Sequence, residues 1–242
     1  MSMENRQEGF VDPQEPLLRT DWHSVEHCCP NDAPATPVIL RHLLDDDTGK
    51  QGAALRNLYQ AVTHQHTFYS ATAPAATFVA AILAHPRTLV EVTDQTPWEV
   101  AHRGEKPRFL LRVGLLNWLR STAADANDES PGGLQADIEA FRALRPALHD
   151  AIRPLLTDRD REIREAALAA LLPLLAAPEL AHHRAELRDT VLALATEDTP
   201  YRRHAVRALA AWGEDTTPFQ REANTPTDAR PSAEGFADDP PF

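Results

Sequence analysis

Cysteine is scarce in this 242-residue chain, which contains two, the adjacent Cys28 and Cys29. Neighbouring cysteines rarely bridge each other because the small ring strains the peptide between them, so the sequence excludes a disulfide framework. A chain without disulfides fits a reducing compartment, and we expect a cytoplasmic location.

Long apolar runs and a targeting signal are missing as well. The longest apolar runs fall far short of the ~20 residues that a membrane span needs. The opening stretch MSMENRQEGF lacks the basic-then-apolar pattern of a signal peptide. These absences predict that the chain has no membrane partner.

An excess of positive charge is also absent. The formal net charge is −12, and much of it lies in the acidic segments 1–16 and 215–242, which leaves the remainder mildly acidic. Binding to nucleic-acid phosphates needs a basic field, so a nucleic-acid partner is disfavoured.

Glycine and aromatic residues are few, whereas Ala and Leu are abundant. Ala, Leu, Arg and Glu lose little entropy in a helix, so this composition favours helices over strands. Pro146 and Pro154 should break or kink the segment that contains them. One run, TLVEV at 88–92, looks like a strand but could not form a sheet alone. Apolar spacing predicts helices at about 34–44, 51–65, 73–84, 107–121, 134–156, 160–175, 182–196 and 200–212, with a shorter one near 17–28.

Breaks in this pattern define the expected organisation of the chain. Residues 1–16 and the acidic, Pro-rich 215–242 have no periodicity, and we expect both to be disordered tails. The body, 17–214, is expected to be one helical domain. Two connections inside it, 88–106 and 122–133, are expected to be loops.

Two segments in the second half of the body follow one plan. Residues 155–175 and 193–213 align at a constant offset, which pairs Leu156 with Leu194, Asp160 with Asp198, Arg164 with Arg202, Ala167 with Ala205 and Leu171 with Leu209. Residues 43–62 follow a similar plan with one residue fewer. In each copy an Asp in the turn can cap the following helix, and small Ala positions let that helix approach its neighbours. Such a helix pair cannot bury its apolar face alone, so it stacks on the next pair.

The stretch DRDREIREAALAAL (158–171) resembles the signature of HEAT-like repeats at Asp158, Ile163, Arg164, Ala166, Ala167 and Leu171. EDTPYRRHAVRALAAWG (197–213) is similar, with Tyr201 in place of the aliphatic residue. The first copy departs from the signature at Gln51 and Gly52. WHSVEH (22–27) and THQHTFYSATAPAATFVAAILAHP (63–86) look like actinobacterial proteins of this armadillo-type family. The resemblance implies an all-α fold, a right-handed α-solenoid of HEAT-like helix pairs.

The stretch DWHSVEHCCP (21–30) has the residue types of a zinc site, with His23, His27, Cys28 and Cys29. On a helix, His23 and His27 share a face, but the two cysteines point elsewhere. We therefore favour a capping helix in which Trp22 packs inward and His27 lies in the core. We expect no metal and no cofactor.

A polar corner is the second candidate, formed by His27, His64, Gln65, Thr67 and Tyr69. No nucleophile or paired acid lies nearby in the sequence, so we expect these side chains to satisfy helix-end carbonyls. If a small ligand binds this protein, the corner is the first place to look.

The third candidate is a basic face that could bind a partner, made of Arg184, Arg188, Arg202, Arg203 and Arg207. Acidic residues are interleaved with it, so it could equally be an ordinary solvated surface. Trp98, in the first long connection, is an aromatic that either anchors the loop or meets a partner.

These patterns predict a non-catalytic cytoplasmic scaffold that binds a protein. One version of this hypothesis is an acidic protein that neutralises a basic one. The alternative is an enzyme or an enzyme-assisting protein, either similar to the HEAT-like lyases that attach bilins or with a metal-dependent site at the corner of His27 and His64.

Overall fold

A computed structural model describes residues 15–219, and in this range the protein is predominantly helical. The all-α prediction is confirmed. Most of the two expected tails lies outside the described residues. Inside that range the expected boundary at 16/17 falls within the first helix, which begins at Glu15, and a 3-10 turn, Thr217–Phe219, lies in the expected C-terminal tail.

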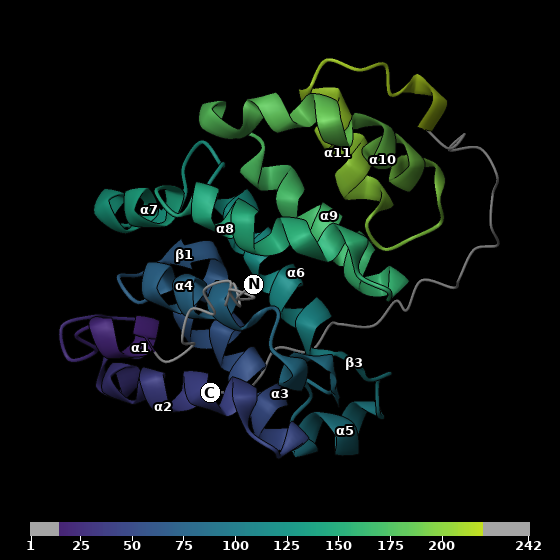
Figure 1. Ribbon diagram of the computed structural model, residues 1–242. Helices are drawn as coiled ribbons and strands as arrows, with labels where there is room; N and C mark the ends of the chain where they lie inside the picture. Colours follow the sequence, from purple (N-terminus) through teal and green to yellow (C-terminus); the bar gives the residue numbers. More distant parts are fainter. Residues whose placement is uncertain (1–14, 220–242) are drawn as a thin grey trace, which may run out of the picture.

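Figure 1 shows the chain running from α2 and α3 through α4 and α6 to α9, α10 and α11. The helices are α1 (Glu15–Arg19), α2 (Thr36–Arg41), α3 (Thr48–Asn57), α4 (Thr72–Ile82), α5 (Pro97–Arg103), α6 (Leu111–Asp125), α7 (Gln135–Arg142), α8 (Arg145–Ile152), α9 (Arg161–Leu174), α10 (Arg184–Thr196) and α11 (Arg202–Ala211). A π-helical turn, Leu58–Val62, follows α3, and 3-10 turns occupy Pro30–Ala35, His42–Leu44, His64–His66, Pro86–Leu89, Arg153–Thr157 and Pro178–His183.

The predicted helix near 17–28 is wrong. Helix α1 ends at Arg19, and the chain continues to Cys29 as turns and extended backbone. The N–H of Glu26 donates to Ser70 Oγ, and that of Cys28 donates to the carbonyl of Ala61. These amides are bonded to distant residues and are therefore not available for a helix ladder.

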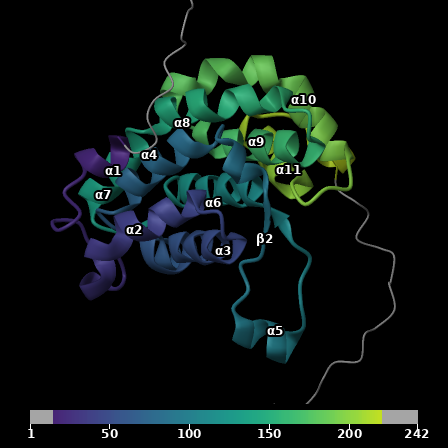
Figure 2. The ribbon, with the colours of Figure 1, turned by 60° about the horizontal axis from the view of Figure 1, so that its bottom comes forward.

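The expected loop 88–106 contains regular structure, which corrects the prediction. Strand β2 (Glu91–Val92) pairs antiparallel with β3 (Phe109–Leu110), and α5 lies between them. Helix α5 begins with a reciprocal capping box between Thr96 and Glu99. Figure 2 shows α5 standing away from the body at the end of this excursion.

The second expected loop, 122–133, is also more regular than predicted. Helix α6 continues to Asp125, and β4 (Gly132–Gly133) pairs in parallel with β1 (Thr67–Phe68). A Cβ at Gly133 would lie 2.2 Å from the carbonyl oxygen of Phe68, and its φ of +110° is in the left-handed region, so glycine is required there.

The proline prediction is confirmed in the segment 134–156. Helix α7 ends at Arg142, α8 begins again with Pro146 in its first turn, and a 3-10 turn starts at Arg153 next to Pro154. Asp160 also caps α9 as predicted, because its side chain accepts the N–H of Glu162 at 2.8 Å.

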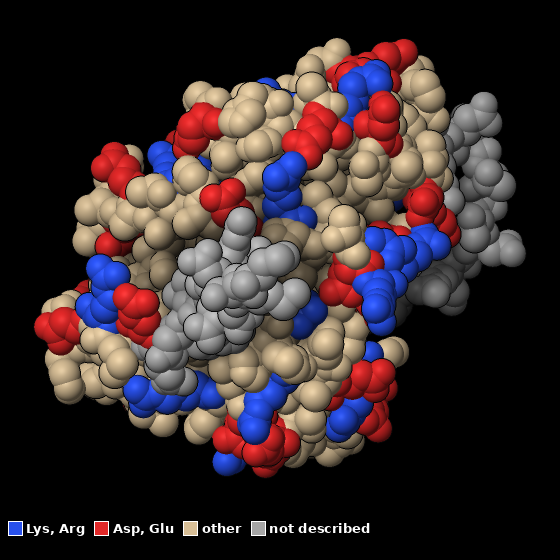
Figure 3. Space-filling model, in the orientation of Figure 1, with Lys and Arg blue, Asp and Glu red and all other residues tan. Residues whose placement is uncertain are grey.

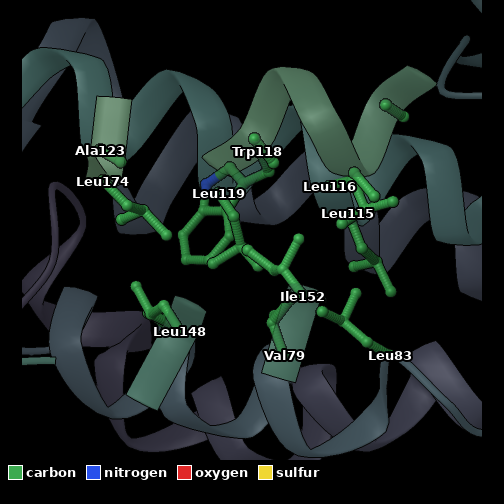
Figure 4. Close-up of a cluster of buried hydrophobic side chains, with 14 of the residues drawn as sticks. Val79, Leu83, Leu115, Leu116, Trp118, Leu119, Ala123, Leu148, Ile152 and Leu174 are labelled. Atoms are coloured by element: carbon green, nitrogen blue, oxygen red, sulfur yellow. The ribbon is translucent and has the colours of Figure 1, made fainter. Parts of the chain in front are cut away.

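Helix α6 is the centre of the hydrophobic core. Figure 4 shows its side chains meeting those of α4, α8 and α9, with Trp118 and Leu119 facing Leu148 and Leu174. Trp118 is fully buried, and its Nε1–H donates to Thr63 Oγ1 at 3.1 Å. Helix α6 packs along α9, α9 contacts α11, and α10 packs on α11.

A buried arginine ties three turns together. The side chain of Arg112 donates to Thr88 Oγ1 (3.0 Å), to the His85 carbonyl (3.1 Å) and to Asp158 Oδ2 (3.2 Å). Arg164 donates to the backbone carbonyl of Asp158 at 2.8 Å, and the other carboxylate oxygen of Asp158 accepts the Asp160 N–H at 2.9 Å. The turn before α9 is thereby fixed to the turn after α4.

Candidate functional site

Two adjoining cavities lie along α6 and α11 and share Arg120 and His204 in their walls. Their volumes are about 630 and 430 Å³. We call the two together the α6–α11 groove. Its size suits a short stretch of polypeptide or a small organic molecule.

The centre of the groove is cationic and partly buried. Arg120, on α6, lies with its Nη1 3.4 Å from Nδ1 of His204, on α11. Burial, together with the charges of Arg120, Arg207 and Arg203, lowers the pKa of His204 to about 4. His204 is therefore neutral at pH 7, and Nε of Arg120 is buried without a protein hydrogen-bond partner.

The walls on either side of this centre differ. The first cavity is bordered by α3, α6 and α11 together with the α5 excursion, and it includes Tyr59, Phe109 and the buried Tyr201. The second lies over α9 and is mostly apolar. Its wall contains Ala124, Ala169, Leu172, Ala208, Ala211 and Trp212. Acidic residues also border the groove, Asp94, Glu99 and Glu162 in the first cavity and Asp128 in the second.

Three arginines of the predicted basic face have structural contacts. Arg184 donates to the carbonyls of Leu175 and Ala176 at the end of α9, although it also borders the groove. Arg188 is paired with Glu214 through two hydrogen bonds. Arg202 donates to the carbonyl of Phe219.

The remaining two members of that face are more available. Arg203 and Arg207 are both exposed, and Arg207 borders the second cavity. Arg207 therefore lies beside the groove, whereas Arg188 and Arg202 are engaged elsewhere in the protein. Partner binding by the five arginines stays a prediction.

Trp98 lies on α5 and is 58% exposed. Its ring stacks on that of His102 with centroids 4.3 Å apart, and the guanidinium carbon of Arg103 lies 5.8 Å from its centroid. The contacts are within its own helix, so Trp98 does not anchor the excursion to the body through them. Its role with a partner stays a prediction.

The predicted polar corner is brought together by the backbone. The Cys28 N–H bonds to Ala61, and the Ala71 N–H bonds to Glu26, so the segment of His27 lies beside that of His64 to Tyr69. Gln65 and His66 have φ values of +50° and +62°, which are uncommon for residues other than glycine.

The backbone of this corner is committed to structure at Thr67 and Tyr69, and the neighbouring His66 is paired. Thr67 pairs with Gly132 in the β1–β4 strand pair, and the Tyr69 N–H donates to Thr72 Oγ1. His66 Nδ1 lies 2.9 Å from Asp125 Oδ1. Burial raises the pKa of Tyr69, and the neighbouring Cys28 adds to the rise.

Three of the four residues suggested for a zinc site lie close together. A ring nitrogen of His27 and the sulfurs of Cys28 and Cys29 all lie within 4.8 Å of one another. His23 is not in this cluster. The argument that the cysteines point away assumed a helix, and that assumption is wrong because residues 21–29 are not helical.

Arg120 is a groove residue that sequence reasoning missed. Its signal was present, because it is a single cation at the end of the apolar run LLRVGLLNWLR. His204 follows Arg203 in the sequence, within the predicted helix 200–212. Its proximity to Arg120 depends on how α6 and α11 lie on α9, which the local sequence does not contain.

Charge on the surface is mixed. On the face in Figure 3, basic and acidic side chains lie next to one another in scattered groups, separated by uncharged surface. Within residues 15–219, none of the helices combines the length and apolar character that a membrane span requires. Comparison with protein-family models, curated proteins and solved structures gives no match to this chain.

Proposed function

We propose that this protein is a non-catalytic scaffold of HEAT-like helix pairs that binds a protein segment in the α6–α11 groove. The observation that carries the proposal is the groove itself, in which an apolar wall continues into a partly buried arginine. The cytoplasmic location and the absence of a nucleic-acid partner remain part of this proposal.

The order of helix packing supports the repeat interpretation. Helices α3, α6, α9 and α11 contact one another in sequence order, and α4 contacts α8 on the other side. Helices α8 and α9, and then α10 and α11, are neighbours in the chain that pack as pairs. This is the nearest-neighbour pattern expected of a solenoid, and it puts the two aligned segments side by side in α9 and α11.

The chemistry of the groove favours an apolar segment that carries a carboxylate. Arg120 presents a guanidinium with a buried Nε that lacks a protein partner, and Arg207 stands at the edge. A carboxylate at this point would form charge-assisted hydrogen bonds in a partly desolvated setting. The alanine-rich wall of the second cavity then accepts the neighbouring apolar side chains.

Two adjacent exposed alanines of α11 provide a matched test. Ala211 lines the second cavity and Ala210 does not. We expect Ala211→Trp to fill the groove and Ala210→Trp to leave it open, because neighbouring residues of a helix point about 100° apart. Both variants should keep the helical circular dichroism spectrum of the parent protein.

The readout is quantitative affinity capture with mass spectrometry from an extract of the source organism. The proposal predicts partner proteins that bind the parent and Ala210→Trp equally and are depleted at least about tenfold on Ala211→Trp, which corresponds to about 1.4 kcal/mol of binding free energy. Partners captured equally by all three proteins would refute binding in the groove.

A further inference from the structure

The side chains of His27, Cys28 and Cys29 form a cluster of metal-ligand atoms outside the α6–α11 groove. Its three candidate ligand atoms lie within 4.8 Å of one another, and the two sulfurs are 3.2 Å apart. Among the His, Cys, Asp and Glu side chains of residues 15–219, these three form a group compact enough to surround one ion.

The backbone holds this cluster in place through contacts distant in sequence. The Cys28 N–H donates to the Ala61 carbonyl at 3.1 Å, and the Cys28 thiol lies 3.2 Å from the Gln60 carbonyl. Two residues before Cys28, the Glu26 N–H donates to Ser70 Oγ and the Glu26 carbonyl accepts the Ala71 N–H. Because the segment is fixed to the end of α3 and the start of α4, the ligand atoms need little ordering when an ion binds.

His27 gives a second observation that points to a ligand. Its side chain is 2% exposed, and Nε2 has no hydrogen-bond partner. Its Nδ1 accepts the N–H of Cys29 at 3.0 Å. Because Nδ1 accepts a hydrogen bond, the proton of the neutral ring is on Nε2, where it has no acceptor, and a buried donor without a partner costs free energy. Coordination of a cation by Nε2 moves that proton to Nδ1, breaks the bond from the Cys29 N–H and removes the unsatisfied donor.

We propose that His27, Cys28 and Cys29 form a zinc-binding site with three protein ligands. Two thiolates and one imidazole are the donor set that Zn²⁺ takes in proteins, whereas Mg²⁺ and Ca²⁺ require oxygen ligands. The two thiolate charges balance the charge of the ion.

The geometry needs a modest adjustment to hold the ion. Sulfurs bound to zinc at about 2.3 Å in a tetrahedral arrangement lie about 3.8 Å apart, so the present gap opens by about half an ångström. Cys29 is exposed and Cys28 is half-buried, so this change does not disturb the core. The exposed side of Cys29 leaves the fourth coordination position to a water molecule or to a partner's side chain.

The test is a zinc titration of the reduced full-length chain in competition with a chromophoric chelator. The proposal predicts one zinc per chain. With Co²⁺ as a spectroscopic probe, it predicts a sulfur-to-cobalt charge-transfer band in the near ultraviolet. Cys29→Ser should weaken zinc binding by at least about tenfold and reduce that band, because the change removes one thiolate from an exposed position.

His23→Ala is the matched control, since His23 is exposed, lies in the same stretch and is outside the cluster. It should bind zinc like the parent. The proposal is overturned if the reduced parent, with both thiols free and its helical spectrum intact, binds no zinc. It is also overturned if Cys29→Ser binds zinc as tightly as the parent, because the ion then lies elsewhere.

Discussion

At the scale of single residues, neighbouring groups change the pKa values and hydrogen bonds of polar side chains. His204 has an ordinary histidine pKa in isolation, and the helices around it make it a weak base by burying it next to three arginines. The sequence shows the arginines of its own helix but not Arg120, which is 84 positions away. The sequence therefore shows that His204 lies among arginines of its own helix, but it does not predict the contact with Arg120.

The lowered pKa of His204 makes a prediction about pH. Its folded value of about 4 lies below the ordinary 6.5, so between these values the unfolded chain binds more protons than the folded one. The contribution of His204 to stability is therefore present above pH 6.5 and is lost as the pH falls towards 4. Histidine titration by NMR should show His204 titrating well below 6.5, and Arg120→Gln should raise its pKa in part, since burial remains. Titration at or above 6.5 would contradict this assignment.

Arg112 gives a second prediction at this scale. Its side chain is 6% exposed and bonds to three groups, so Arg112→Leu leaves Asp158 and two further acceptors without their donor. We expect the free energy of unfolding, measured in urea, to fall by about 3–5 kcal/mol. Arg153→Leu is the comparison, because Arg153 pairs with Glu186 at the half-exposed surface and should cost at most about 1 kcal/mol. Equal losses for the two variants would refute a special role for Arg112.

At the scale of elements, helices with strong apolar periodicity and a capping Asp were predictable. Helix α9 is the best example, since 160–175 was predicted and the helix runs from Arg161 to Leu174. The helix predictions were wrong where backbone groups form hydrogen bonds with residues distant in the sequence. Residues 21–29 are bonded to the 60–71 segment, and α5 depends on a capping box inside a stretch that looked irregular.

Gly52 shows how a departure from the repeat signature can be explained by an element. A Cβ there would lie 2.1 Å from the carbonyl oxygen of Thr93, so α3 and the strand excursion approach too closely for a side chain. The neighbouring Gln51 is buried and donates to the carbonyls of Leu43 and Arg87, 3.1 Å from each. Gly52 therefore serves the contact with the inserted excursion, and Gln51 joins α3 to the turns before it and after α4.

This contact predicts the result of Gly52→Ala. Helix propensity alone would stabilise α3 by about 1 kcal/mol, but the clash is with backbone and should outweigh that gain with a net loss of about 1–3 kcal/mol. Ala53→Leu, at the exposed next position, should change stability by less than about 0.5 kcal/mol. A Gly52→Ala variant as stable as the parent in urea unfolding would show that Thr93 does not lie against α3.

At the scale of the whole molecule, we propose that the helices form a stack in which each pair is covered by the next. The aligned segments predicted that 155–175 and 193–213 resemble each other, and α9 and α11 do pack together. The sequence could not predict the groove, because the shared wall of Arg120 and His204 arises from three helices at once. The hydrophobic core extends from Leu17 to Leu209 as one cluster, with α6 near its middle.

Native-state hydrogen exchange tests this stack most directly. In a stack, the terminal pair α10 and α11 touches one neighbour and should open at a lower free energy than α6, which is covered on both sides. Leu209→Ala should therefore speed exchange in α10 and α11 while leaving the amides of α6 nearly unchanged. Equal acceleration throughout residues 15–219 would mean that the protein opens as one unit, and would contradict the stacking of helix pairs.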